Sequence, residues 1–358
     1  MNVKKRALFG VLALLLVSCF AVGTASAATV VVPNSLANVE GNSGNDFPFN
    51  ISIYTPTPSM RYQQVFQSSE FSAFGGPSLI TQIAFRPDGG TYGSAFSSTL
   101  SSIRIDLSTT SVAPDSLDST FAKNVGADAK TVYYGSLPLS SAFTGPEGGP
   151  KNFDITINLT TPFFYDPTAG NLLLDVRNYD GGVTTYIDSQ LTSGDSTSRV
   201  FSVVSGHVDD SSGERDSEGL VTQFTNSPVP VFTCVGFEIA TNNGRGRLKN
   251  IKVLQLKADL VNRDGNIVIG TDISFLPILH VVMEKTGGST AIDVTDGALS
   301  AGRGTSGNQF VFTSGGEWQF NLMTRNYTTP GTYTVSILTG NIFEYIIKPT
   351  CTATFVIE

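Results

Sequence analysis

Five carboxylates within ten residues form the densest group of side chains in this sequence that could do chemistry. They alternate with serine and glycine, and they are Asp209, Asp210, Glu214, Asp216 and Glu218. Carboxylate oxygens are hard ligands of the kind that calcium collects, six to eight at a time, from flexible loops. The spacing is not that of an EF-hand, because Glu218 does not take the twelfth place of the loop. Charge runs usually face water, so a solvated loop is the favoured interpretation and a calcium site is the alternative.

Two cysteines, Cys234 and Cys351, form the second group, and 116 residues separate them. In an oxidising compartment such a pair usually ends as a disulfide, and closing a loop of this length stabilises by about 4 to 5 kcal/mol less any native strain. Two separately buried thiols are the alternative. A zinc site is disfavoured, because two cysteines without a close histidine do not complete a tetrahedral ligand set.

Catalytic patterns are largely missing from the sequence. It has two histidines, His207 and His280, and no His-Glu-x-x-His, Gly-x-Ser-x-Gly or Cys-x-x-Cys motif. We expect His280, within an apolar run, in the core or at a strand edge, and His207 in a loop. The run 302–307 matches Gly-x-Gly-x-x-Gly, but residues 309–312 after it read as strand where a dinucleotide site needs a helix. We therefore expect that the protein is not an enzyme. We expect residues 302–307 to form a glycine-rich hairpin loop.

The elements that must position these residues read as strands. Apolar and polar residues alternate in four runs: Ile103, Ile105 and Leu107; Phe153, Ile155, Ile157 and Leu159; Leu172, Leu174 and Val176; and Tyr333, Val335 and Ile337. Between such runs lie turn sequences such as Asp88-Gly89-Gly90 and Asp180-Gly181-Gly182. The 36 glycines and 17 prolines interrupt the chain too often for long helices. The sequence predicts an all-β protein of sandwich or barrel type.

Charge divides the chain into two parts. Residues 29–230 hold 9 basic and 20 acidic side chains, whereas residues 231–358 hold 10 of each. The net charge of −8 makes nucleic acid an unsuitable partner. The proline-spaced run Asn226-Ser227-Pro228-Val229-Pro230 marks the boundary, because proline does not continue a central strand. We expect a β-sandwich over 28–226, a linker and lead-in over 227–250, and a second β-sandwich over 251–358.

The first 27 residues have the features of an export signal. Lys4, Lys5 and Arg6 precede a long apolar stretch, and Ala25-Ser26-Ala27 forms a small-residue cleavage site. The stretch is too short to span a bilayer, so we expect no transmembrane helix in the mature chain. Leu16-Val17-Ser18-Cys19 resembles a lipobox, and lipid attachment at Cys19 is the minority alternative to free secretion.

Several motifs of the first part resemble a known family in the same order. They are Val31 to Ser43, Arg61 to Val65, Ile83 to Asp88, Asn171 to Asn178 and Asp195 to Phe201. Over residues 30–225 the chain resembles the ectodomain of PEP-CTERM bacterial surface proteins, which are sorted by an exosortase. The resemblance implies a jelly-roll-like sandwich in an exported envelope or matrix protein, and it implies no catalytic residues. The family's Pro-Glu-Pro motif, membrane helix and basic tail do not follow residue 230.

The second part resembles, more weakly, the Ig-like sandwich modules of bacterial secreted proteins that are named for a Pro-x-Lys-Phe motif. The likeness lies in residues 256–266, 317–322 and 330–335, and the name motif itself is missing. Trp318, the only tryptophan, alternates with Phe320 and Leu322. We expect it to lie in the core.

Three classes of function follow from the sequence. The first is an exported envelope or extracellular-matrix protein with a non-enzymatic, structural or cohesive role, whose partners are other envelope proteins. The second is a module that binds extracellular polysaccharide through exposed aromatic rings, for which Tyr62, Tyr133, Tyr134 and Tyr179 are candidates. The third is a secreted hydrolase, which lacks the usual bases. A chain with 30 acidic residues always offers paired carboxylates, so their presence does not favour it.

Overall fold

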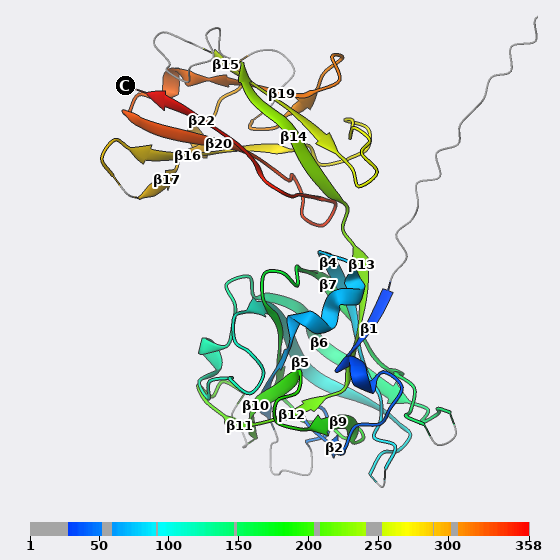
Figure 1. Ribbon diagram of the computed structural model, residues 1–358. Helices are drawn as coiled ribbons and strands as arrows, with labels where there is room; N and C mark the ends of the chain where they lie inside the picture. Colours follow the sequence, from blue (N-terminus) through cyan, green and yellow to red (C-terminus); the bar gives the residue numbers. More distant parts are fainter. Residues whose placement is uncertain are drawn as a thin grey trace, which may run out of the picture.

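The computed structural model describes residues 28–51, 59–90, 92–146, 149–203, 208–240, 253–288, 290–301 and 307–357. The predicted signal over 1–27, with Cys19, lies outside the described residues, as do His207 and most of the glycine-rich run over 302–307. Within the described ranges the regular structure is strand apart from short 3-10 turns, which confirms the all-β prediction. No helix in these ranges is long and apolar enough to cross a membrane. Figure 1 shows two bodies joined by one crossing of the chain.

The N-terminal module, blue to green in Figure 1, is a sandwich of two antiparallel sheets with a small third sheet at one end. The first sheet has the order β1 (Ala28–Val32), β13 (Thr222–Pro228), β4 (Ser78–Phe85), β7 (Ile155–Tyr165). The second has the order β11 (Glu214–Asp216), β10 (Thr197–Val203), β3 (Met60–Phe66), β8 (Asn171–Asn178), β5 (Phe96–Thr110), β6 (Lys130–Ser141). The third consists of β12 (Glu218–Leu220), β9 (Ile187–Leu191) and β2 (Ser43–Asn45).

The core of this module lies between the two large sheets. The alternating residues predicted for β5, β7 and β8 bury their apolar faces there, as a half-buried strand requires, except Phe153, which precedes β7 and is half-buried. The 3-10 helix η2 (Ser68–Phe74) closes one side of this core with Phe71. Its ring lies 5.3 Å from that of Phe224, which in turn lies 4.9 Å from that of Phe66. One aromatic cluster therefore joins β13, β3 and η2.

Strand β3 is buried on both faces, although it carries polar residues. Tyr62 points into the core, while Arg61 and Gln63 point to the opposite face. There the 3-10 helix η3 (Phe121–Lys123) covers them, with the guanidinium of Arg61 4.6 Å from the ring centre of Phe121. Arg61 also donates to Asp175 on β8, at 3.1 Å and 2.6 Å. The polar residues of the strand are therefore paired beneath a covering segment.

The C-terminal module, yellow-green to red in Figure 1, is a second sandwich. One sheet has the order β18 (Val311–Phe312), β19 (Trp318–Met323), β15 (Val253–Val261), β14 (Val231–Ala240), β21 (Ile346–Ile347). The facing sheet has the order β17 (Ala291–Asp293), β16 (Ile278–Lys285), β20 (Gly331–Leu338), β22 (Cys351–Ile357). The 3-10 helices η4 (Thr295–Gly297) and η5 (Thr324–Asn326) lie in its loops.

The core of the second module is separate from the first. Trp318 is fully buried in it, and its indole N–H donates to the carbonyl of Val268 at 2.8 Å. Tyr333 on β20 stacks on Phe355 of β22 with ring centres 5.0 Å apart. The prediction that Trp318 is a core residue is confirmed, and each module has a hydrophobic core of its own.

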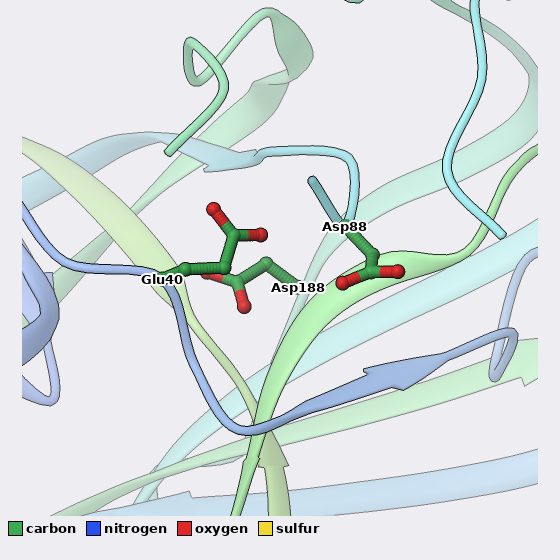
Figure 2. Close-up of side chains that lie close together, drawn as sticks. All are labelled: Glu40, Asp88 and Asp188. Atoms are coloured by element: carbon green, nitrogen blue, oxygen red, sulfur yellow. The ribbon is translucent and has the colours of Figure 1, made fainter. Parts of the chain in front are cut away.

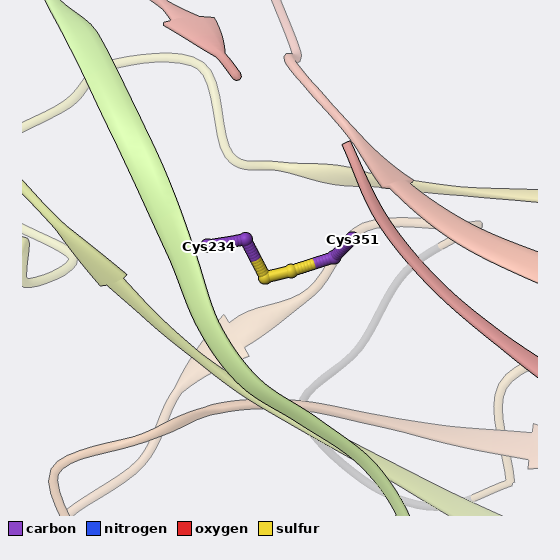
Figure 3. Close-up of a disulfide and its surroundings, with 2 residues drawn as sticks. All are labelled: Cys234 and Cys351. Atoms are coloured by element: carbon purple, nitrogen blue, oxygen red, sulfur yellow. A yellow bond between two sulfur atoms is a disulfide. The ribbon is translucent and has the colours of Figure 1, made fainter. Parts of the chain in front are cut away.

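The predicted bond between Cys234 and Cys351 is present (Figure 3). Cys234 lies on β14 and Cys351 begins β22, and these strands belong to the two facing sheets. Their Cα atoms are 5.6 Å apart, within the usual span of a disulfide. The bond therefore ties the first strand of the module to its last across the core.

The junction between the modules is shorter than expected. We predicted a linker and lead-in over residues 227–250, but Val231–Ala240 forms β14 and pairs along β15, so this part of the range is a strand of the C-terminal module. The crossing consists of Val229 and Pro230, and residues 241–252 lie outside the described ranges. Beside it, the ammonium of Lys348 lies 2.9 Å from Asp166 of the N-terminal module.

Candidate functional site

Three carboxylates meet at the end of the N-terminal module where the small sheet lies (Figure 2). Glu40 precedes β2 in the segment that follows the 3-10 helix η1 (Asn34–Leu36), Asp88 follows β4, and Asp188 lies on β9. Each residue offers one oxygen, and these oxygens all lie within 4.8 Å of one another. In the part of the chain that the structure describes, this is the one group of three potential metal-ligating residues so close together.

Backbone pairing brings the three residues together. Asp188 donates its backbone N–H to the carbonyl of Arg86, and Asp88 donates its own to the carbonyl of Tyr186, both at 3.0 Å. This pairing places the chain after β4 beside β9. On its other edge β9 pairs with β2, and Gly44 lies opposite Asp188. The site is therefore built on extended backbone that is hydrogen-bonded on both sides of Asp188.

Arg86 is the cation of the site. Its guanidinium lies against the Asp188 carboxylate, with nitrogen–oxygen distances of 2.7 Å and 2.6 Å, and both side chains are fully buried. It also donates to the carbonyls of Leu36 at 3.0 Å and Val39 at 2.6 Å, and so fixes the segment that delivers Glu40. The guanidinium carbon of Arg86 lies 4.9 Å from the ring centre of Phe153. In the described chain Arg86 is therefore the one cation paired with this group, through Asp188.

The remaining carboxylate oxygens are poorly satisfied. Asp88 is 8% exposed, and its carboxylate accepts no hydrogen bond from any described residue. One oxygen of Glu40 accepts from the backbone N–H of Gly89 at 2.6 Å, while the other, Oε2, is buried without a partner in the described chain. Buried polar atoms are nearly always paired, so the arrangement is unusual.

Glycines allow the backbone to lie directly against these carboxylates. A Cβ atom on Gly44 would lie 2.9 Å from the Asp88 carboxylate, and one on Gly89 would lie 3.0 Å from Glu40 Oε2. A Cβ on Gly90 would lie 3.1 Å from an oxygen of Asp88. These contacts are closer than Cβ atoms ordinarily make, so larger residues would displace the carboxylates.

Electrostatics oppose three full charges at this site. Two like charges no more than 4.8 Å apart repel by at least about 3.5 kcal/mol at an effective dielectric constant of about 20. Burial raises the pKa of Asp188 well above its usual range, and the Glu40 carboxylate adds to the rise, although Arg86 and the N–H of Gly41 lower it. The protein alone therefore leaves part of this negative charge uncompensated.

The acidic loop predicted as the alternative calcium site is arranged differently. Asp216 and Glu218 both bind Arg199, at 2.8 Å and 2.5 Å, while Asp209 and Glu214 are exposed and Asp210 is half-buried. The calcium site there stays a prediction, and no three of these five carboxylates form a close group in the part of the chain that the structure describes. The physical reason is that Glu214–Asp216 and Glu218–Leu220 are strands, and extended chain separates side chains by about 3.3 Å per residue.

Arg199 lines a polar cavity of about 310 Å³ beside this segment. Arg215, Asp216 and three serines contribute to its wall, the serines being Ser193, Ser198 and Ser217. One guanidinium nitrogen of Arg199, Nη1, is buried without a hydrogen-bond partner in the described chain. The cavity lies at the same end of the module as the three carboxylates. Arg199 in its wall binds Glu218, and Glu218 accepts a hydrogen bond from Ser189 of β9 at 2.7 Å.

The aromatic residues proposed as a stacking platform differ in their exposure to solvent. Tyr62 is wholly buried and donates to Gln64 at 2.6 Å, so it cannot stack on a ligand. Tyr133 and Tyr179 are half-buried, whereas Tyr134 is 67% exposed. Sequence reasoning missed Tyr92, which is 68% exposed and lies with its ring 5.2 Å from that of Tyr186.

His280 lies on β16, half-buried, with its Nε2 3.4 Å from an oxygen of Asp293. This agrees with the expected strand position.

No protein-family model matches the chain, and no curated protein matches it.

Sequence reasoning missed the site of Glu40, Asp88 and Asp188 because its members come from three distant segments. A local signal was present: Glu40 and Asp88 are each followed directly by glycine. Asp88-Gly89-Gly90 was interpreted as a turn, which is the commonest role of such a sequence, and Glu40-Gly41 was interpreted only as part of the family resemblance.

Proposed function

We infer that this chain is an exported bacterial surface or extracellular-matrix protein with a non-enzymatic, cohesive role. The observation that carries the proposal is the disulfide between β14 and β22, which ties the two facing sheets of the C-terminal module together. Such bonds persist in oxidising surroundings outside the cytoplasm. The export signal predicted over residues 1–27 supports the same location.

The module boundaries support the resemblances on which the role rests. The stretch that resembles PEP-CTERM ectodomains, residues 30–225, lies within the N-terminal module, which runs from Ala28 to Pro228. The runs that resemble Ig-like modules fall largely on β15, β19 and β20 of the C-terminal module. Two sandwiches in series, joined by a two-residue crossing, suit a protein that links surfaces or matrix components.

Deletion of the gene in the native host tests this role. We expect the extracellular matrix of the deletion strain to lose cohesion under shear while growth in suspension is unchanged, and re-expression of the full chain to restore it. A second complementing strain carries Cys234→Ala and Cys351→Ala, and we expect it to restore cohesion less well. Unchanged matrix strength in the deletion strain would contradict the cohesive role.

Binding of extracellular polysaccharide is the second candidate function, and the exposed tyrosines favour it. Tyr92 and Tyr186 lie with their rings tilted by 34°, beside the acidic site, and Tyr134 is exposed elsewhere on the module. Aromatic faces of this kind stack on sugar rings. Affinity electrophoresis in gels containing the host polysaccharide tests this function. Retardation that Tyr92→Ala abolishes and Tyr134→Ala leaves intact would place binding at the Tyr92 pair, and absence of retardation would refute it.

A further inference from the structure

The acidic site of Glu40, Asp88 and Asp188 has a charge that the protein does not balance. Arg86 is the cation bound to it in the described chain, and its guanidinium is already engaged by Asp188 and by backbone carbonyls. Three carboxylates against one guanidinium leave two negative charges. A divalent cation would neutralise both.

The unpaired side chain of Asp88 is a separate sign of a missing ligand. The residue is 8% exposed, no described residue donates a hydrogen bond to its carboxylate, and one of its oxygens lies within 4.8 Å of an oxygen of Glu40 and of an oxygen of Asp188. Glu40 Oε2 is buried beside it and is equally without a partner there. A buried carboxylate loses its hydration and must regain it from a donor or a cation. No donor of the described chain fills this role, so the geometry favours a cation.

The ligand atoms identify the class of cation. All three side chains offer oxygen, which hard cations prefer to nitrogen and sulfur ligands. Calcium accepts the irregular arrangement of carboxylates that three loops and strands provide, whereas magnesium demands a near-ideal octahedron.

We propose that the N-terminal module binds one calcium ion between Glu40, Asp88 and Asp188. Water and backbone carbonyls complete its six to eight ligands. The ion joins the segment after η1, the loop after β4 and strand β9, and so fixes the loop that leads to Tyr92. Extracellular modules bind calcium with dissociation constants of about 10⁻⁴ to 10⁻³ M, and we expect this range here.

Calcium titration of the mature chain, residues 28–358, tests the proposal. The protein is stripped with chelator and titrated to about 10 mM calcium, ten times the weaker expected dissociation constant, in an isothermal calorimeter. The test variant is Asp88→Asn, which keeps the size of the side chain and removes a charge that has no hydrogen bond to lose. The matched control is Asp209→Asn, which removes one charge from an exposed position.

We expect one calcium ion per natural chain, an affinity at least about tenfold weaker in Asp88→Asn, and an unchanged affinity in Asp209→Asn. Differential scanning calorimetry adds the unfolding temperature, on which the substitution should have opposite effects without and with calcium. Without calcium, Asp88→Asn should unfold at the same temperature as the natural chain or higher, because a repelling charge is gone; with calcium, only the natural chain and the control should gain stability.

Four results would overturn the proposal. One is the absence of calcium binding to the natural chain over the whole titration. Another is binding that Asp88→Asn leaves intact, which would place the ion elsewhere. The third is magnesium binding as tight as calcium binding, which would refute the assignment of the ion. A variant that melts at a much lower temperature without calcium would show that Asp88 is a structural residue whose charge the protein already balances.

Discussion

Removal of the disulfide should destabilise the C-terminal module alone. The two cysteines are 117 residues apart in sequence, and the loop-closure model gives about 5 kcal/mol for a bond across such a span. With an m-value of about 2 kcal/mol/M in urea, the double variant Cys234→Ala, Cys351→Ala should lower the midpoint of this module by about 2 M or more. The N-terminal module should keep its midpoint, because its core shares no residue with that of the second.

Fluorescence of Trp318 makes this change measurable in the full chain. It is the only tryptophan, it is fully buried in the C-terminal core, and its emission therefore reports the unfolding of that module. Far-ultraviolet circular dichroism follows both modules and supplies the second transition. The natural chain after reduction is the control, because it loses the bond and keeps both sulfur atoms in place.

Two outcomes would refute this reasoning. A fluorescence midpoint that moves by less than about 0.5 M would mean that the bond contributes little beyond the packing of β14 and β22. If the transition of the N-terminal module, which only circular dichroism detects, shifts by the same amount, the two modules unfold as one unit. In that case the separation of their cores would not make them independent.

Two further predictions concern charged pairs. Arg61→Met leaves Asp175 buried without its main partner and should cost the N-terminal module about 3 to 5 kcal/mol in urea unfolding, most of which the double variant with Asp175→Leu should recover; equal losses in both would contradict this. Lys348→Met should cost less than about 1 kcal/mol, because Lys348 is half exposed. Burial would raise the pKa of Asp166, but hydrogen bonds from Lys348 and Thr168 lower it below 3.8. The effect of Lys348→Met should therefore be present at neutral pH and vanish as the pH falls below this value; an effect that grows in acid would refute it.

Local patterns in the sequence were sufficient for the strands and their cores. Alternation over Ile103, Ile105 and Leu107 predicted β5, and the lone Trp318 between strand residues was correctly placed in the core. The disulfide was predicted because two cysteines remain in a chain for which export is predicted. These features depend on residues a few positions apart or on chemistry that needs no knowledge of the fold.

The candidate site could not be predicted in the same way. Glu40 and Asp88 are 48 residues apart, and Asp188 follows after another 100, so strand pairing alone brings them together. The dense acids from Asp209 to Glu218 form no such group in the described chain, because strands separate neighbouring side chains and Arg199 pairs with Asp216 and Glu218. Proximity in the sequence predicts a site only where the backbone turns back on itself.

The intact mass of the protein recovered from the native host, measured without reduction on the extracellular and cytoplasmic fractions, tests the central claim of export most directly. We predict a chain in the extracellular fraction that begins at Ala28 and has the mass of the oxidised Cys234–Cys351 pair, lower by two hydrogens than after reduction. A chain that keeps residues 1–27 and both thiols and stays in the cytoplasm would contradict the account. A lipid-modified chain beginning at Cys19 would contradict free secretion and place the protein on a membrane instead.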